Sequence, residues 1–230
     1  NARWTAAGRR RAKRPGKSDP LDARAVAIFV RQESPDLPVV YAEDQTAILD
    51  LLTTEREAAI GEATRLRNQI HALLVQLDPE YEVRLPTLKS RSGLAVVARY
   101  VARSDSAVQK ERASAVRRLA ERLALALAQA EDLARRIKQM AEESFAPLTR
   151  LCGVNMLTAG ALAGILGPGP RFANDAQLAA FAGVAPLEAS SAGLVRHRLN
   201  RGGNRRLNAI VYRIVLTQAH HSPEARAYLA

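Results

Sequence analysis

The sequence has a single cysteine, few aromatic residues and no long apolar run. Cys152 alone can form neither an internal disulfide nor a cysteine-based zinc site, which suits the reducing cytoplasm. No apolar run approaches the ~20 residues that span a bilayer, and no signal peptide is visible. HExxH, Walker and zinc spacings are absent as well. These absences exclude a disulfide-stapled protein, a membrane-spanning protein and the common metal and nucleotide motifs.

Positive charge is in excess. The 230 residues include 34 Lys and Arg against 23 Asp and Glu, which gives a formal net charge of +11. Such an excess favours polyanionic partners, nucleic acid first and an anionic membrane surface second. Because aromatic residues make up only 4% of the chain, contacts to phosphates and grooves are expected rather than stacking on bases.

The segment KSDPLDA at 17–23 follows directly on a basic run at 9–14. Asp19 and Asp22 are three residues apart at the expected start of a helix, so they can share one face and hold a divalent cation. The neighbouring cations can bring a phosphate backbone to that metal. The same residues also suit plain helix capping by Ser18 or Asp19, and residue chemistry alone favours capping.

Two long segments carry apolar residues at coiled-coil spacing. The first runs from Gln45 to Leu77 and is interrupted at Arg56. Joined by a connector rich in Pro and Gly, the two segments predict a coiled-coil hairpin, or arms that pair between subunits. A shorter helix is expected from Pro20 to Gln32, with Leu21, Ala25, Ile28 and Phe29 on its buried side. The second long stripe consists of Val116, Leu119, Leu123, Ala126, Ala130, Leu133, Ile137 and Met140.

The last third of the chain, from about Ala146, has short segments and frequent Gly and Pro, which predicts a separate compact helical domain. Residues 151–160 suggest a helix, a tight turn and a second helix, and backbone N–H groups at such a turn can hold a phosphate. The match to a helix-hairpin-helix is imperfect, because Asn155 stands where a second glycine is expected.

A flexible segment at 185–193 contains Ser190 and Ser191. A loop serine beside several guanidinium groups can attack phosphorus, since the cations offset the developing charge. An exposed polar turn is the commoner interpretation of such residues. Gly202-Gly203-Asn204 then predicts a turn and a cap before a final helix. The basic residues that follow the segment are Arg196, His197, Arg198, Arg201, Arg205 and Arg206.

Three segments, in this order, resemble the DEDD-type, Piv/MooV-like insertion-sequence transposases, also called bridge-RNA-guided recombinases. KSDPLDA is similar to the family's K-S/T-D-x-x-D-A, and TRLRNQIHALL at 64–74 is similar to a stretch of its coiled coil. GVNMLTA, Phe172, LAAFAGVAP, SSAG and RGGNRRL, between Gly153 and Leu207, resemble its C-terminal domain.

The resemblance implies a mainly α chain of three regions. Residues 1–42 would be the C-terminal remnant of a RuvC-like, RNase H-type domain, 43–145 the coiled-coil helices, and 146–230 the domain with the serine loop. Asp19 and Asp22 would bind Mg²⁺ as two of four carboxylates, and Ser190 or Ser191 would attack DNA to form a phosphoserine link. Nucleic acid would be held by Arg9, Arg10, Arg11, Lys13, Arg14, Lys17, Arg196, Arg198, Arg201, Arg205 and Arg206. The implied partners are DNA, a structured guide RNA and further copies of the chain through the coiled coil, with no membrane.

The chain also departs from the family pattern. Ala192 interrupts S-S-G, and Gly203 is inserted before Asn204. The first two acidic residues would lie upstream of Asn1, so we expect a truncated chain that is inactive alone, because a metal site depends on its full ligand set. The alternative is a non-catalytic basic helical module that binds nucleic acid or pairs through its coiled coil.

Overall fold

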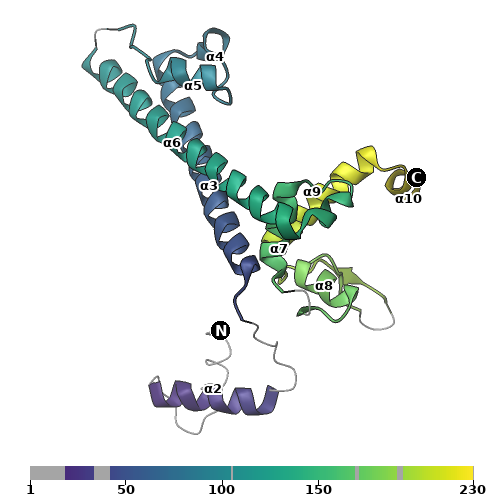
Figure 1. The fold of residues 1–230 in the computed structure, drawn as a ribbon. Coiled ribbons are helices and arrows are strands. Elements are labelled where there is room, and N and C mark those ends of the chain that lie inside the picture. The colour runs from purple at the N-terminus through teal and green to yellow at the C-terminus, as the bar shows by residue number, and fades with distance from the viewer. Residues whose placement is uncertain (1–18, 34–41, 105, 169–170, 191–193, 230) are drawn as a thin grey trace. The chain divides into compact units, whose positions relative to one another are not determined.

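The computed structural model describes residues 19–33, 42–104, 106–168, 171–190 and 194–229. It is mainly helical, which confirms the predicted fold class. The chain divides into two units, residues 1–42 and 43–230. Among the described helices, none is both long and apolar enough to cross a membrane. In chain order the elements are α2 (Asp19–Glu33), α3 (Gln45–Leu77), α4 (Tyr81–Arg84), α5 (Arg91–Val97), α6 (Ala107–Ser144), η2 (Ala146–Arg150), α7 (Met156–Leu166), α8 (Asp175–Ala182), β1 (Leu187–Glu188), β2 (His197–Arg198), α9 (Arg205–His221) and α10 (Pro223–Leu229) (Figure 1).

The first unit contains α2, close to the helix predicted from Pro20 to Gln32. Leu21, Ala25 and Phe29 are half-buried, as expected from their spacing along one face. Ile28, predicted on the same side, is 40% exposed because it lies at the edge of that face.

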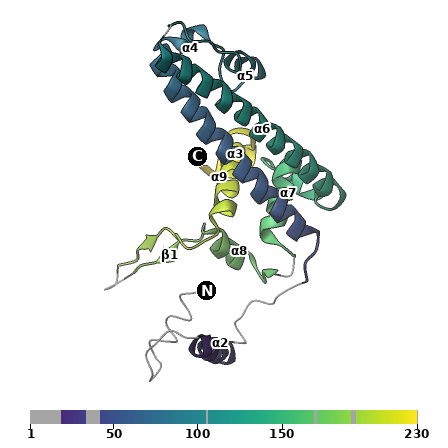
Figure 2. The same ribbon diagram turned by 90° about the vertical axis from the view of Figure 1, so that its left-hand side faces the viewer.

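In the second unit, α3 and α6 lie side by side and form the predicted hairpin (Figures 1 and 2). Gln129 Nε2 donates to Glu55 Oε1 at 3.1 Å, and Gln109 Nε2 donates to the Gln76 carbonyl at 3.4 Å. Residue numbers therefore rise along one helix as they fall along the other, so the helices are antiparallel and their two stripes cover each other within one chain. The buried apolar residues are Leu49, Leu52, Ala59, Ala63, Leu66, Ile70 and Leu74 on α3, and Ala113, Val116, Ala120, Leu123, Ala126, Ala130, Leu133, Ile137 and Ala141 on α6.

The connector of the hairpin, expected to be irregular, contains the short helices α4 and α5. Tyr81, Leu88 and Val97 from this connector are buried against the two long helices. His71 Nδ1 is hydrogen-bonded to Tyr81 Oη, which in turn donates to Glu82 Oε1 at 3.0 Å. His71 thus has a structural role: it joins α3 to the cap over the end of the hairpin.

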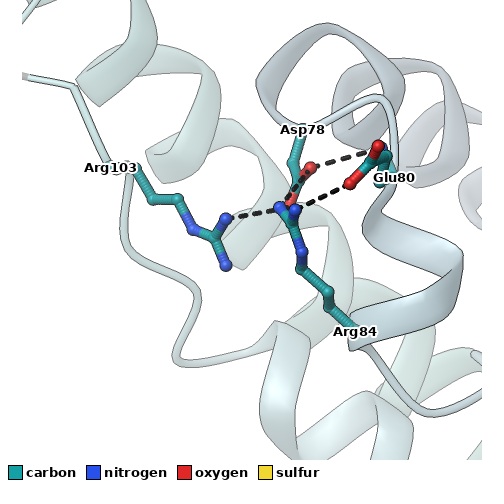
Figure 3. A network of polar contacts seen from close by, with 4 residues as sticks. All are labelled: Asp78, Glu80, Arg84 and Arg103. Atoms are coloured by element: carbon teal, nitrogen blue, oxygen red, sulfur yellow. Dashed lines mark hydrogen bonds and ion pairs between the residues drawn. The ribbon is translucent and has the colours of Figure 1, made fainter.

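Asp78 ends α3 and lies at the centre of an ion-pair network (Figure 3). Arg84 Nη1 donates to both carboxylate oxygens of Asp78 at 2.9 Å, and Arg103 Nη1 lies 3.5 Å from Oδ2. Arg84 Nη2 also donates to Glu80 Oε2 at 2.7 Å. Burial acts to raise the pKa of Asp78, but the hydrogen bonds from Arg84 and the Glu80 amide, with the charges of both arginines, outweigh it and lower the pKa.

We expect Asp78→Asn to destabilise the protein in a pH-dependent way. A carboxylate whose pKa is lowered by folding stabilises the protein above its unfolded pKa of about 3.9, and this stability is lost as the pH falls through the lower folded value. Urea unfolding should therefore show the largest difference from the unmodified protein near neutral pH, and this difference should shrink as the pH falls through the lowered folded pKa of Asp78. Glu80→Gln, at a largely exposed side chain, is the control and should change little. A loss of equal size at every pH would contradict the electrostatic explanation.

The helix α7 packs against both arms at the other end of the hairpin. A Cβ added to Gly160 would lie 2.6 Å from Ile137 Cγ2 of α6, and one added to Gly164 would lie 2.5 Å from the Asp50 nitrogen of α3. These close approaches bury Ala163 of α7 between the arms. Another cluster joins α7 to α8 and α9 through Val154, Ala159, Leu162, Ile165, Ala182, Leu207 and Ile210.

Candidate nucleic-acid site

The segment predicted to be flexible, 185–193, contains the strand β1, which pairs with β2 beyond the segment to form a short antiparallel hairpin. Leu187 pairs with Arg198 and Glu188 with His197. One step further along, the Ala189 amide donates to the carbonyl of the residue before β2 at 2.8 Å. The first residues of the segment are therefore paired in a strand, which was not predicted, and the flexibility of the segment stays a prediction. We call residues 187–198 the serine hairpin.

Ser190 lies two residues beyond the end of β1 and is exposed. Its Oγ accepts a hydrogen bond from the Arg196 amide at 3.2 Å, across the hairpin. Ser191 lies outside the described residues. The Ser190 hydroxyl keeps its proton for another acceptor, since it is the acceptor in this bond.

Two arginines belong to the serine hairpin, Arg196 and Arg198, and two follow it, Arg201 and Arg205. All are exposed, and within the described parts of the chain none of them has a carboxylate partner. Arg198 and Arg201 also line an open depression of about 440 Å³, together with Leu187, Leu199 and Gly202. Uncompensated guanidinium groups beside such a depression are suited to bind phosphate.

The segment that follows the serine hairpin is held to α8. Its amide groups donate to the last carbonyl groups of α8, which need partners from outside their own helix. Asn200 Nδ2 donates to the Ala180 carbonyl at 3.2 Å, and Asn208 Nδ2 to the Ala182 carbonyl at 3.1 Å. The Asn204 amide donates to the Phe181 carbonyl at 2.7 Å. The Asn204 side chain also caps α9, as predicted, by accepting from the Leu207 amide at 3.0 Å.

The glycine inserted before Asn204 has a structural reason. A Cβ on Gly203 would lie 2.3 Å from the Cα of Gly183, which itself ends α8 with a φ of +71°. Only glycine fits where these two backbones meet, because any side chain would force the turn away from α8. The sequence showed the extra glycine but gave no sign of its neighbour.

Arg206 has a different environment from the other arginines. Its Nη1 lies 2.8 Å from Asp50 Oδ1 and its Nε lies 2.7 Å from Glu57 Oε2, both on α3. The side chain is 31% exposed. The charge of Arg206 is therefore compensated within the fold, and its side chain joins α9 to α3. A role for Arg206 in binding nucleic acid stays a prediction.

The tight turn before α7 is also present, although a 3₁₀ helix, η2, precedes it in place of an α-helix. Gly153 has a φ of +88°, and a Cβ there would lie 3.0 Å from the Ile214 carbonyl of α9. Asn155 caps α7 by accepting from the Thr158 amide at 2.9 Å, which accounts for asparagine at a position where glycine was expected. One side of this turn thus packs on α9.

Asp19 and Asp22 both lie in the first turn of α2. Asp19 is exposed and Asp22 is half-buried. Their spacing places them on one face of the helix, as predicted. Across the described ranges there is no group of three or more His, Cys, Asp or Glu side chains that could hold a metal ion. The predicted basic residues Arg9, Arg10, Arg11, Lys13, Arg14 and Lys17 fall outside the described residues.

Comparison with known proteins assigns two regions of the chain to one family: the N-terminal region, which contains Asp19 and Asp22, and the C-terminal region, which contains the serine hairpin. Residues 1–79 match a transposase domain of DEDD type named for IS110, and residues 146–230 match the "Transposase IS116/IS110/IS902 family". Together the matches cover more than two thirds of the chain. The chain belongs to the IS110 family of transposases.

A relative agrees with this assignment. The "Insertion element IS110 uncharacterized 43.6 kDa protein" of Streptomyces coelicolor is 28% identical over 255 aligned positions, which cover 92% of this chain. The chain spans 63% of the length of that relative. In this IS110-family transposase, Asp19 and Asp22 fall in the first matched region and the serine hairpin in the second.

Proposed function

We propose that this transposase takes part in the transposition of an insertion sequence, by cleaving and rejoining DNA with a serine of the serine hairpin. The observation that carries the proposal is the position of Ser190, exposed two residues beyond β1, near arginines that have no carboxylate partner among the described residues. Family membership supplies the substrate class, because a transposase acts on DNA. Residues 146–230 would bring the serine, 1–42 the RuvC-like part of the catalytic centre, and 43–145 the coiled-coil spacer between them.

The proposed step is a transesterification. The Oγ of Ser190 or Ser191 attacks a phosphodiester phosphorus, forming one O–P bond while the bond to the departing sugar oxygen breaks. The serine proton ends on that oxygen, so atoms and charge balance without any oxidant or reductant. Arg198, Arg201 and Arg205 would bind the phosphate oxygens and stabilise the extra negative charge of the transition state.

Asp19 and Asp22 would hold a divalent metal, for which Mg²⁺ is the proposal. Paired carboxylates on one helical turn fit part of such a site, since Mg²⁺ prefers oxygen ligands. Two carboxylates are fewer than the four that the family resemblance implies, so further ligands would be needed. A bound divalent ion would supply Lewis-acid polarisation of a phosphoryl oxygen.

The proposed partners follow from the same regions. DNA would contact the serine hairpin and the basic residues near Lys17, a guide RNA would be a second polyanion on the same positive surface, and copies of the chain would pair through the coiled coil. A non-catalytic nucleic-acid-binding module is the second candidate, favoured by the net charge of +11. Such a module would bind DNA with a steep salt dependence and would be indifferent to Asp19→Asn.

The deciding experiment is a search for a covalent protein–DNA adduct. The complete reading frame that encodes these residues is expressed with its insertion-sequence DNA and Mg²⁺, the product is denatured, and the protein is digested. We expect a nucleotide-bearing peptide that contains Ser190 and Ser191. An adduct mapped to any other residue would remove the serine assignment, and DNA binding without any adduct would favour the second candidate.

A further inference from the structure

Arg171 and two phenylalanines form a surface cluster that the proposed serine chemistry does not use. The Arg171 Cζ lies 4.5 Å from the centre of the Phe181 ring and 5.4 Å from the centre of the Phe172 ring. The two rings are 5.3 Å apart and tilted by 49° to each other. Both phenylalanines are half-buried, while Arg171 is exposed. The chain has only four phenylalanines, so half of them support one guanidinium group. We call these three residues the arginine platform.

The guanidinium group of Arg171 is held in place but its charge is not neutralised. Among the described residues its side chain makes one hydrogen bond, from Nη1 to the Leu166 carbonyl at 3.4 Å. No carboxylate in the described ranges pairs with it. Contact with the faces of aromatic rings attracts the cation and leaves its positive charge in place. One side of the group is thus covered by aromatic carbon, and the other side is available to a ligand that is planar or anionic.

Phe181 of the platform belongs to the end of α8 that holds the segment following the serine hairpin. The Phe181 carbonyl accepts from the Asn204 amide at 2.7 Å. One residue earlier on α8, the Ala180 carbonyl accepts from Asn200 Nδ2 at 3.2 Å. Arg201 lies between these two contacts in sequence and lines the depression beside the hairpin. At most three residues, about 10 Å of chain, separate Arg201 from the contact with Phe181. A strand whose phosphates bind in the depression would therefore bring its bases close to the platform.

We propose that the arginine platform is a stacking site for a nucleobase of a single DNA strand that lies along the serine hairpin. The base would stack on the side of the Arg171 guanidinium that faces away from Phe172 and Phe181. Guanidinium groups stack on flat rings, and every base offers a π face, so the site would accept bases of any type. A base inside a duplex is already stacked between its neighbours, so the platform would select single-stranded positions. The proposal rests on the proposed function for its substrate, and it adds stacking to the phosphate contacts expected from the low aromatic content.

The test compares two strands that carry the same phosphates. The 230-residue chain is titrated with an oligothymidylate and with an abasic strand of equal length, at the same salt concentration. We expect the oligothymidylate to bind about 5- to 150-fold more tightly, the range for stacking one base. Arg171→Lys keeps the positive charge but removes the flat group, so it should lose most of this preference while binding the abasic strand as before. Arg150→Lys, at another exposed arginine, is the matched control and should keep the preference.

Phe172→Leu removes the aromatic face behind the guanidinium and leaves an apolar side chain in its half-buried place, so it should lower the preference as well. If Arg171→Lys weakens the binding of both strands equally, the arginine contacts phosphate alone and the stacking site does not exist. An unchanged preference in Arg171→Lys would overturn the proposal too, as would equal affinity of the unmodified chain for the two strands. The assay needs no covalent step. A chain that forms no serine adduct can therefore still show the preference, and a failed preference leaves the serine assignment standing.

Discussion

Replacing Gly164 by alanine is expected to destabilise the protein by about 2 kcal/mol or more, although alanine is the better helix former by about 1 kcal/mol. The added Cβ would lie 2.5 Å from the backbone nitrogen of Asp50 and 2.8 Å from its Cα. Both atoms belong to the backbone of α3, so no side-chain rotation can relieve the contact. The helix α7 would have to move away from the hairpin, and the core around Leu49, Ile137 and Ala163 would open.

Gly61 provides a matched control, because it is also a glycine inside a long helix. A Cβ there would meet only the end of the Arg65 side chain, at 3.5 Å. Gly61→Ala should therefore stabilise the protein by about 0.5–1 kcal/mol through helix propensity alone. Urea unfolding of the two variants should give shifts of opposite sign. If both variants gain stability, α7 does not pack on α3 as closely as we describe.

The same contrast explains why the hairpin of α3 and α6 could be predicted from the sequence and the packing of α7 against it could not. Leu52, Ala59 and Leu66 repeat every seven residues, and a period in sequence translates directly into a face of a helix. Gly160 and Gly164 show only that one face of α7 lacks side chains at these two positions. They do not show which helix packs against that face. The close approach is decided by residues more than a hundred positions away, such as Asp50, and a single sequence has no local signal for that distance.

Short elements were missed for a related reason. The strands of the serine hairpin have two residues each, so no alternation of apolar and polar side chains could reveal them. Pro79, Pro86 and Gly93 correctly predicted a connection between the two long helices, but not the short helices α4 and α5 that it contains; Gly93 itself lies inside α5.

Among the candidate site residues, side-chain type was predictable and environment was not. Arg205 and Arg206 are adjacent and chemically identical in sequence. Successive helix positions point about 100° apart, so one arginine is exposed and the other reaches the carboxylates of Asp50 and Glu57. Only the three-dimensional position of α3 separates them.

Replacing both Ser190 and Ser191 by alanine is expected to abolish adduct formation, by at least about 1000-fold, because no other group in the serine hairpin can form the phosphate ester. The change should cost little stability. Ser190 is exposed and its Oγ accepts a single hydrogen bond, from the Arg196 amide, so the free energy of unfolding should change by about 0.5 kcal/mol or less. DNA affinity should also be unaffected, since the arginines that would bind phosphate remain.

The single variants divide the two serines. Whichever of Ser190→Ala and Ser191→Ala loses the adduct identifies the nucleophile, while the other should retain most of the reaction. Ser114→Ala is the control, because this hydroxyl lies on α6, outside the serine hairpin, where it donates to the Lys110 carbonyl at 3.1 Å and accepts from Arg117 Nη2 at 2.9 Å. Adducts are quantified on denaturing gels beside unfolding curves and binding isotherms for each variant. A double variant that still forms the adduct at the original rate would show that the hydroxyl attacking DNA lies elsewhere in the complex, and the arginines around this hairpin would then serve only to hold the strand.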